Sequence, residues 1–204
     1  IVIAIRLAGE PGRQKLRGVY RYISEHHLNW HLELIRADDD ISVEYVASLA
    51  ERKVDGIVYS LPRAKDCSAA LARLAIPTVT IDVFDAPALE RRTRNLVTIR
   101  SDSEAIGRAA ARHFLSLGNF RSFAFVHDPR GEIWTQVRGI AFAEALKKHK
   151  RSCAVHTPAS VRRTGSRRHL ADFLLSLPQP AAVLAACDAV AADVIDACQA
   201  ARLA

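Results

Sequence analysis

The sequence predicts an α/β protein made of two doubly wound lobes, each with a parallel sheet covered by helices on both faces. Short apolar runs alternate along the chain with segments whose apolar residues recur at helical spacing. Several of these runs are almost continuously apolar, which is typical of parallel strands that are buried on both faces. A short internal repeat indicates that the pattern occurs twice.

Eight short apolar runs are predicted to be the strands of these sheets. They are Ile1–Ile5, His31–Ile35, Gly56–Ser60, Pro77–Ile81, Leu96–Ile99, Ser122–Val126, Cys153–His156 and Ala181–Ala186. The first run lacks a basic leader and a small-residue cleavage site, so it is interpreted as a core strand and not as a signal peptide. Because the chain starts in a strand and stops inside a helical pattern, we expect it to be a fragment of a longer protein.

Helices are predicted between the strands, because apolar residues spaced i, i+3, i+4 and i+7 form one stripe on a helix. Three such stripes are Leu16, Val19, Tyr20 and Ile23; Val43, Val46, Ala47 and Ala50; and Ile106, Ala109, Ala110, His113 and Leu117. Later helices are predicted near Thr135–Lys148, Arg167–Leu177 and Asp188–Ala201. The turn at Asp55-Gly56 ends one helix and starts a strand, and Gly118 closes another helix.

The internal repeat appears when the numbering is shifted by 121. The strand Ile1–Ile5 then falls on Ser122–Val126, and the helical dipeptide Arg17-Gly18 falls on Arg138-Gly139. The repeat indicates a boundary near Gly118. We therefore expect an N-terminal lobe over residues 1–119 and a C-terminal lobe over 120–204, incomplete at its end.

Composition is that of an ordinary soluble globular protein: 50% of the 204 residues are apolar and 25% are charged. No run approaches 18 uncharged apolar residues, so no membrane span is expected. The net charge of +7 is spread along the chain, with small clusters at 91–94 and 162–168. Aromatic residues do not alternate with these clusters, which favours a solvated surface over a nucleic-acid site.

Catalytic and metal motifs are missing from the sequence. It has no P-loop, no dinucleotide fingerprint, no G-x-S-x-G elbow and no H-E-x-x-H motif. The four cysteines form no C-x-x-C pair and are interpreted as small core or surface residues, and nothing demands an oxidising compartment. The histidines at 26, 27 and 31 are interpreted as a solvated helix end. We therefore expect no enzyme activity, no cofactor and no metal.

Binding chemistry is expected beyond the carboxyl ends of the strands, where open α/β sheets bind their ligands. These ends lead into the polar loops Arg6–Arg13, Leu61–Asp66, Asp82–Asp85, His127–Thr135 and Cys187–Asp188. A sugar requires planar hydrogen-bonding groups for its hydroxyls and an aromatic face for its C–H side. Arg138, Asp188 and Trp134 supply these groups. The alternatives are a surface position for Arg138, a helix cap for Asp188 and a core position for Trp134.

A longer pattern resembles the ligand-binding core of the lac-repressor family, whose fold is periplasmic-binding-protein-like. The pattern comprises Val97, Asp102, Gly107, Ala110, His113-Phe114 and Gly118 at the spacing of that family's central signature. Further matching pieces are Val54–Val58, Ile76–Val79, Arg138 with Phe142, and Ala185–Ala191. Together they cover essentially the whole chain.

Three details are similar to the xylose-operon activators of this family, in which an AraC-type helix-turn-helix domain follows the sensor core. They are Arg13-Gln14 at the first helix, Trp134 four residues before Arg138, and the Leu175–Pro178 segment. The resemblance implies two lobes joined by three crossovers, a homodimer, cytoplasmic location and a sugar-like effector in the cleft. Operator DNA would bind through a domain outside this fragment.

The resemblance also implies ligand contacts for single residues. It implies that Arg138 binds ligand hydroxyls, that Asp188 faces the cleft, and that Asp102 lies near the ligand or caps its helix. Arg13 and Trp134 complete the expected set. Cys187 departs from the pattern, because many relatives have Asn there. A periplasmic sugar carrier with the same fold is the alternative function, and an α/β enzyme is the third.

Overall fold

The computed structural model describes residues 1–7, 9–35, 41–60, 65–71, 73–82, 95–157 and 166–203. The chain forms two compact units, residues 1–101 and 102–204. Both are α/β units with parallel sheets, so the predicted fold class is confirmed. None of the helices among the described residues is long and apolar enough to cross a membrane.

The sheet of unit 1 has five parallel strands in the order β2-β1-β3-β4-β5. They are β1 (Val2–Ile5), β2 (Glu33–Ile35), β3 (Ile57–Ser60), β4 (Thr78–Ile81) and β5 (Leu96–Ile99). Each lies inside a run that the sequence predicts to be a strand. All four residues of β1 are buried, because this strand is central and has helices on both of its faces.

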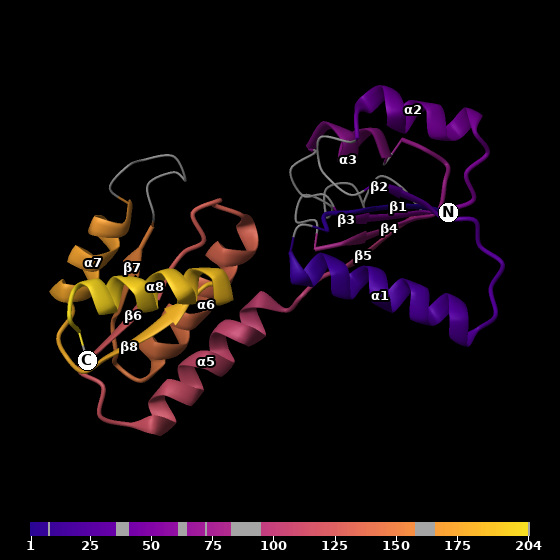
Figure 1. Cartoon of the computed structure of the whole chain (residues 1–204). Coiled ribbons are helices and arrows are strands. Elements are labelled where there is room, and N and C mark those ends of the chain that lie inside the picture. The colour runs from indigo at the N-terminus through magenta and orange to yellow at the C-terminus, as the bar shows by residue number, and fades with distance from the viewer. Residues whose placement is uncertain are drawn as a thin grey trace. The chain divides into compact units, whose positions relative to one another are not determined.

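Helices cover both faces of this sheet, with α1 (Glu10–Glu25) on one side and α2 (Val43–Glu51) and α3 (Lys65–Leu71) on the other (Figure 1). The core under α2 and α3 packs Val46 and Leu49 against Val2, Ala4 and Tyr59 of the sheet. The predicted helices at α1 and α2 are confirmed, but their predicted stripes are only partly buried. In α2 Val46 is buried whereas Val43, Ala47 and Ala50 are exposed, and in α1 Tyr20 is exposed. The sequence analysis placed no helix at α3, because its seven residues are too few to complete a stripe.

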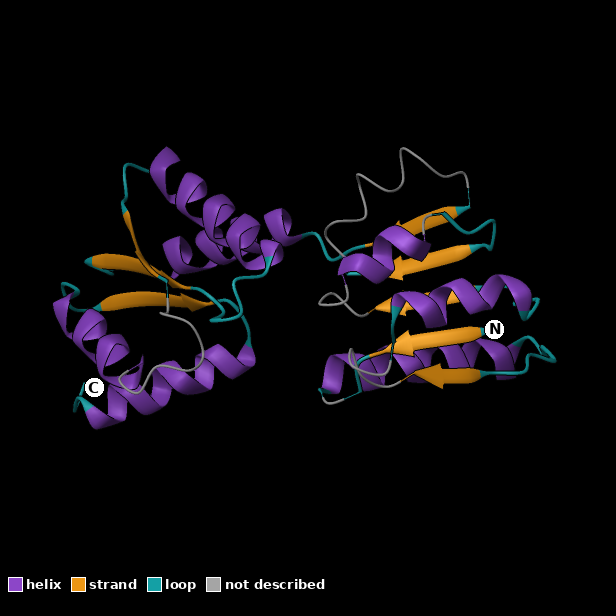
Figure 2. Cartoon of the chain, turned by 90° about the horizontal axis from the view of Figure 1, so that it is seen from above, coloured by secondary structure: helices purple, strands orange, loops and turns teal. Residues whose placement is uncertain are grey.

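Unit 2 has three parallel strands in the order β7-β6-β8, flanked by two helices on each face (Figure 2). The strands are β6 (Ser122–Val126), β7 (Cys153–His156) and β8 (Ala181–Ala185). The helices are α5 (Ser103–Leu117), α6 (Ile133–Lys148), α7 (Ser166–Ser176) and α8 (Asp188–Ala200). Alternate residues of β6 face opposite cores: Phe125 packs under α5 and α6, and Val126 packs under α7 and α8.

The two units divide at 101/102, whereas the sequence analysis divided the lobes at 119/120. The difference is α5, which packs along α6 and so belongs to unit 2. Gly107 explains this close packing: a Cβ at this position would lie only 2.4 Å from the carbonyl oxygen of Arg138. The internal repeat begins at β6, so the boundary inferred from it left α5, the preceding helix, in the N-terminal lobe.

The internal repeat also needs a correction at its helices. Both α1 and α6 have 16 residues, so the sixth position is Lys15 in α1 and Arg138 in α6. The shift of 121 instead aligned Arg17 with Arg138 and Gly18 with Gly139. A Cβ on Gly139 would lie 2.7 Å from the ring of Phe125, whereas nothing lies within 4 Å of one on Gly18. The loop after β6 is therefore longer than the loop after β1, and Lys15 is the counterpart of Arg138.

Candidate functional site

Polar side chains gather at the carboxyl edge of the unit 2 sheet. His127 and Asp128 follow β6, His156 ends β7, and Cys187 follows β8. Because the three strands are parallel and paired, these residues lie at one edge of the sheet. The sequence analysis predicted a site in these loops, although it did not select Asp128.

Asp128 and Arg130 form the strongest polar contact at this edge. The Arg130 side chain donates from Nε to Oδ1 at 2.9 Å and from Nη2 to Oδ2 at 2.6 Å, and its backbone N–H also donates to Oδ1. Burial raises the pKa of Asp128, but the hydrogen bonds and charge of Arg130 outweigh it, so the pKa lies below its usual value. The Asp128 carboxylate thus stays ionised and fixes the loop after β6.

Thr135 connects this loop to the start of α6. Its hydroxyl accepts a hydrogen bond from the backbone N–H of Asp128 at 3.2 Å and lies 3.2 Å from Nδ1 of His127. Thr135 is completely buried. Burial also lowers the pKa of His127, so this imidazole is neutral at pH 7. A buried hydroxyl therefore holds the loop in one conformation and presents its polar side chains at a fixed place.

Trp134 and Arg138 lie together on α6, as their spacing of four residues predicts. The Arg138 guanidinium lies over the Trp134 ring, with its central carbon 4.9 Å from the ring centroid. Its Nη1 donates to the carbonyl oxygen of Ala186, just after β8. Trp134 donates from Nε1 to Glu132 at 2.7 Å. These contacts hold the guanidinium and the indole in one orientation.

Three buried polar atoms at this edge have no hydrogen-bond partner. They are Nε of Arg138, Oε1 of Glu132 and Nδ1 of His156. Burial lowers the pKa of Arg138, which shows that its guanidinium gives up part of its hydration. Buried polar atoms are normally hydrogen-bonded, so unpartnered donors and acceptors indicate a place for a polar ligand or ordered water.

Asp188 is the first residue of α8 and is exposed. The N-cap of α8 is Cys187, and no side chain caps this helix, so Asp188 is not the cap that the sequence analysis considered. The Cys187 thiol lies 3.8 Å from Oδ2 of Asp128. Cys187, the residue that departs from the lac-repressor pattern, therefore contacts Asp128 in this structure.

Unit 1 has its own polar cluster at the carboxyl edge of its sheet. Lys15 of α1 lies 2.9 Å from Oδ2 of Asp82, after β4, and donates to the hydroxyl of Ser60 at the end of β3. Asp82 also accepts hydrogen bonds from the backbone N–H and hydroxyl of Ser101. Burial raises the pKa of Asp82, but Lys15 and Ser101 lower it by more. The sequence analysis missed Lys15, because its repeat aligned Arg17 with Arg138.

Arg13 and Asp102, the other two predicted ligand contacts, belong to neither of these two polar clusters. Arg13 is about half exposed, pairs with Glu10 at 2.8 Å and donates to the carbonyl oxygen of Leu7, close to the end of β1. Asp102 accepts a hydrogen bond from the backbone N–H of Ala105 at 2.8 Å. It is therefore the N-cap of α5, one of the two roles that the resemblance implied.

Part of the predicted site lies outside the described residues. This applies to most of the Leu61–Asp66 and Asp82–Asp85 loops, to the basic cluster 91–94 and to most of 162–168. In the part of the chain that the structure describes, no group of three or more His, Cys, Asp or Glu side chains is arranged to hold a metal ion. All four cysteines are free thiols.

Comparison with known proteins agrees with this fold. Residues 111–204 match the periplasmic binding protein-like domain. No curated protein matches the chain by sequence. Residues 111–204, which form most of unit 2, therefore match the periplasmic-binding-protein-like class of α/β domains, and the fold of the chain is of the same kind.

Solved structures share the fold at low sequence identity. A periplasmic binding protein/LacI transcriptional regulator from Alkaliphilus metalliredigens, complexed with D-xylulofuranose, is 17% identical with a TM-score of 0.71 and covers all of this chain and 72% of its own. The xylose-binding transcription activator XylR is 21% identical with a TM-score of 0.74, and the match covers 98% of this chain but half of that protein. The periplasmic component of a sugar transport system from Hahella chejuensis is 18% identical with a TM-score of 0.68, with coverage of 99% and 75%.

Proposed function

We propose that the chain is the effector-sensing core of a bacterial DNA-binding transcription regulator, and that its effector is a neutral sugar. The observation that carries this proposal is the stacked pair of Arg138 and Trp134 at the carboxyl edge of unit 2. The units 1–101 and 102–204 correspond to the two lobes of such a core. The chain performs no chemistry on the ligand in this proposal.

The stacked pair suits a sugar because it combines two kinds of contact. The indole offers an apolar surface to the C–H face of a sugar ring, and the guanidinium of Arg138, which gives Nη1 to Ala186, has further N–H donors for a hydroxyl. Arg13, Asp102 and Asp188 are the other proposed ligand contacts, and each carries a polar group suited to a hydroxyl.

The charge balance of the site favours a neutral ligand over a sugar phosphate. Lys15 is paired with Asp82, Arg130 with Asp128, and Arg13 with Glu10. Among the described residues, these three cations are therefore neutralised within their own units. A phosphate would need at least one further unpaired cation beside Arg138.

The solved structures favour a regulator, although they include a transport component. XylR is an activator that binds xylose, and the Alkaliphilus protein bears a regulator name and holds a pentulose. The Hahella protein supports the alternative, a periplasmic sugar-binding protein. In the regulator proposal the chain is cytoplasmic, forms a homodimer and reaches operator DNA through a domain outside residues 1–204. Ligand binding then shifts an equilibrium between two states of the regulator.

A thermal-shift panel of pentoses, hexoses, sugar acids and sugar phosphates tests the ligand. A neutral sugar at 100 times its Kd should stabilise the chain by about 2.7 kcal/mol. Stabilisation by phosphates alone would refute the neutral-sugar proposal.

Sequencing the gene on both sides of these residues separates the two functions, because a helix-turn-helix domain supports the regulator and a signal peptide supports the carrier. Mass spectrometry of the recovered ligand should find it unchanged.

A further inference from the structure

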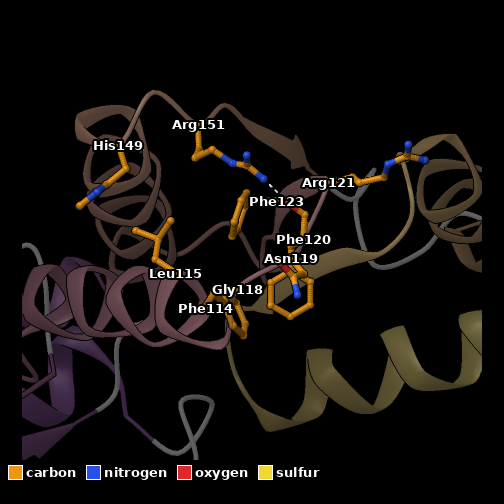
Figure 3. Close-up of a pocket in the computed structure, with 9 residues that line it drawn as sticks. All are labelled: Phe114, Leu115, Gly118, Asn119, Phe120, Arg121, Phe123, His149 and Arg151. Atoms are coloured by element: carbon orange, nitrogen blue, oxygen red, sulfur yellow. Dashed lines mark hydrogen bonds between the residues drawn. The ribbon is translucent and has the colours of Figure 1, made fainter.

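A second hollow lies at the opposite end of unit 2 from the proposed sugar site. It has a volume of about 630 Å³ and lies where α5 ends and β6 begins, between Phe114 and Phe123 along the chain (Figure 3). His149 and Arg151, between α6 and β7, complete it. The amino ends of parallel strands meet at this edge, so the hollow is separate from the carboxyl edge that carries Arg138.

The floor of the hollow is aromatic. Phe120 packs edge-on against Phe114 and against Phe123, with ring centroids 6.1 Å apart in both pairs. Phe123 is buried, whereas Phe114 and Phe120 are partly exposed. The interlocked rings hold one another in place, so they form a firm apolar surface on which a flat ring can lie.

Arg151 is held above this floor. Its Nη2 donates to the carbonyl oxygen of Phe120, and its guanidinium carbon lies 5.1 Å from the centre of the Phe123 ring (Figure 3). The carbonyl takes one of the five N–H donors of the guanidinium. The others remain available to a ligand, in an orientation that the ring and the carbonyl already fix.

The rim of the hollow is cationic. Arg121 and His149 line it together with Arg151, and no acidic residue is among the side chains that line it. Lys147, Lys148 and Lys150 flank His149 in the sequence, and all are exposed. Within the described part of the chain, neither these lysines nor Arg121 and Arg151 form an ion pair.

The macrodipole of α6 explains only part of this charge. Lys147 and Lys148 lie in the last turn of α6, where cations stabilise a helix end. Arg121 and Arg151 lie outside α6. Arg151 is oriented by the carbonyl oxygen of Phe120 and the ring of Phe123, which do not belong to this helix. An accumulation of unpaired cations over an aromatic floor is the chemistry of a site for an anion that carries a flat ring.

We propose that this hollow binds a small phosphate-bearing molecule with a flat ring, the chemistry of a nucleotide. The ring lies on the aromatic floor, and the phosphates accept hydrogen bonds from Arg151. The volume is in the range of small-molecule sites. The inference is independent of the sugar site, which lies at the other edge of the sheet.

Calorimetric titration of the whole chain with ADP, inorganic pyrophosphate and adenosine tests the proposal at low ionic strength. ADP should bind more tightly than either of the other two, because only ADP uses both the floor and the rim. Arg151→Gln should weaken ADP binding by about tenfold or more, which is the usual effect of losing a charge-assisted hydrogen bond. Arg108→Gln is the matched control, since it removes the same charge from α5 outside the hollow and should change the affinity less than twofold.

Two further variants keep the test decisive. If Arg151→Gln does not fold by circular dichroism, Arg151→Lys replaces it and should also weaken ADP binding, because lysine keeps the charge but loses the planar set of donors. Phe120→Leu should reduce ADP binding and leave pyrophosphate binding unchanged. Equal affinities for ADP and pyrophosphate, or equal effects of Arg151→Gln and Arg108→Gln, would overturn the proposal. So would binding of duplex DNA at concentrations where ADP does not bind.

Discussion

Asp128 and Arg130 form a two-pronged ion pair in which the carboxylate is 3% exposed and the guanidinium 37% exposed. The two residues stand in the loop after β6, and the backbone N–H of Arg130 also donates to Asp128. The buried partner is thus held by three hydrogen bonds from one residue. This pair determines the conformation of the loop that precedes Trp134 and Arg138.

Replacing Asp128 by Asn should destabilise the chain by about 1–3 kcal/mol at pH 7, because charge-assisted hydrogen bonds to Arg130 are lost. The folded pKa of Asp128 lies below its unfolded value of about 3.9. Its contribution is therefore fully present above that value and disappears as the pH falls through the folded pKa. Urea unfolding at pH 7 and pH 3 should show the difference from wild type shrinking in acid.

The exposed Asp196→Asn on α8 is the control for this variant, and it should change stability by less than about 0.5 kcal/mol. A difference between wild type and Asp128→Asn that is the same at both pH values would show that the ionised carboxylate is not the cause.

Arg138→Lys should weaken binding of the best sugar in the thermal-shift panel by about tenfold or more. Lysine keeps the charge but loses the planar donors and the stacking on Trp134. The melting temperature of the unliganded protein should change little, because a lysine ammonium still reaches water or a nearby carbonyl. Calorimetric titration measures the affinity, with Arg108→Lys as control. Equal dissociation constants for wild type and Arg138→Lys would remove Arg138 from the site.

Gly107→Ala should destabilise the chain by about 1–3 kcal/mol, as overpacking generally does. The added methyl group would lie 2.4 Å from the carbonyl oxygen of Arg138 and 2.9 Å from the backbone nitrogen of Phe142, neither of which belongs to a flexible side chain. Gly18→Ala is the matched change inside a helix with open space around it, and it should stabilise by about 0.5–1 kcal/mol. Urea midpoints shifted in the same direction by both variants would contradict the close packing of α5 on α6.

The chain should lose stability as the pH falls from 7.5 to 5.5. Burial lowers the pKa of His156, and the neighbouring His169 and His127 lower it further. The neutral ring stabilises the fold fully above the unfolded pKa of about 6.5, and this contribution is lost as the pH falls through the lower folded value. His156→Gln should therefore flatten the dependence of melting temperature on pH, and a slope equal to that of wild type would contradict this role of His156.

The strands were predictable because burial on both faces leaves a strong signal in the sequence. All eight predicted strands are present. All four residues of β1 and four of the five residues of β6 are buried, as their apolar sequences predict. The longer helices were predictable from their apolar spacing, but their buried faces were not: in α5 Ile106 and Leu117 of the predicted stripe are exposed, whereas Gly107 and Ala111 are buried. The helix α3 was not predictable, since seven residues do not complete a stripe, and the unit boundary was displaced because the packing of Gly107 on α6 joins segments 31 residues apart.

The candidate site was predictable where it depends on helical spacing. Trp134 and Arg138 are four residues apart on α6, so their contact follows from the period of the helix. The pair of Asp128 and Arg130 depends on the path of an irregular loop, which no periodicity specifies. The pair of Lys15 and Asp82 joins positions 67 residues apart, and only the parallel order of β1, β3 and β4 brings their ends to one edge. The functional roles of all these residues remain predictions.

The matched sixth positions of α1 and α6 have a consequence for how this protein evolves. In unit 1 the cation at this position is Lys15, and Asp82 of the same unit neutralises it. In unit 2 it is Arg138, whose Nε has no partner. A substitution of Lys15 removes an ion pair within unit 1. A substitution of Arg138 removes the stack on Trp134 and, in the proposed function, alters recognition, so selection for a new effector can act at this position without disturbing the ion pair of unit 1.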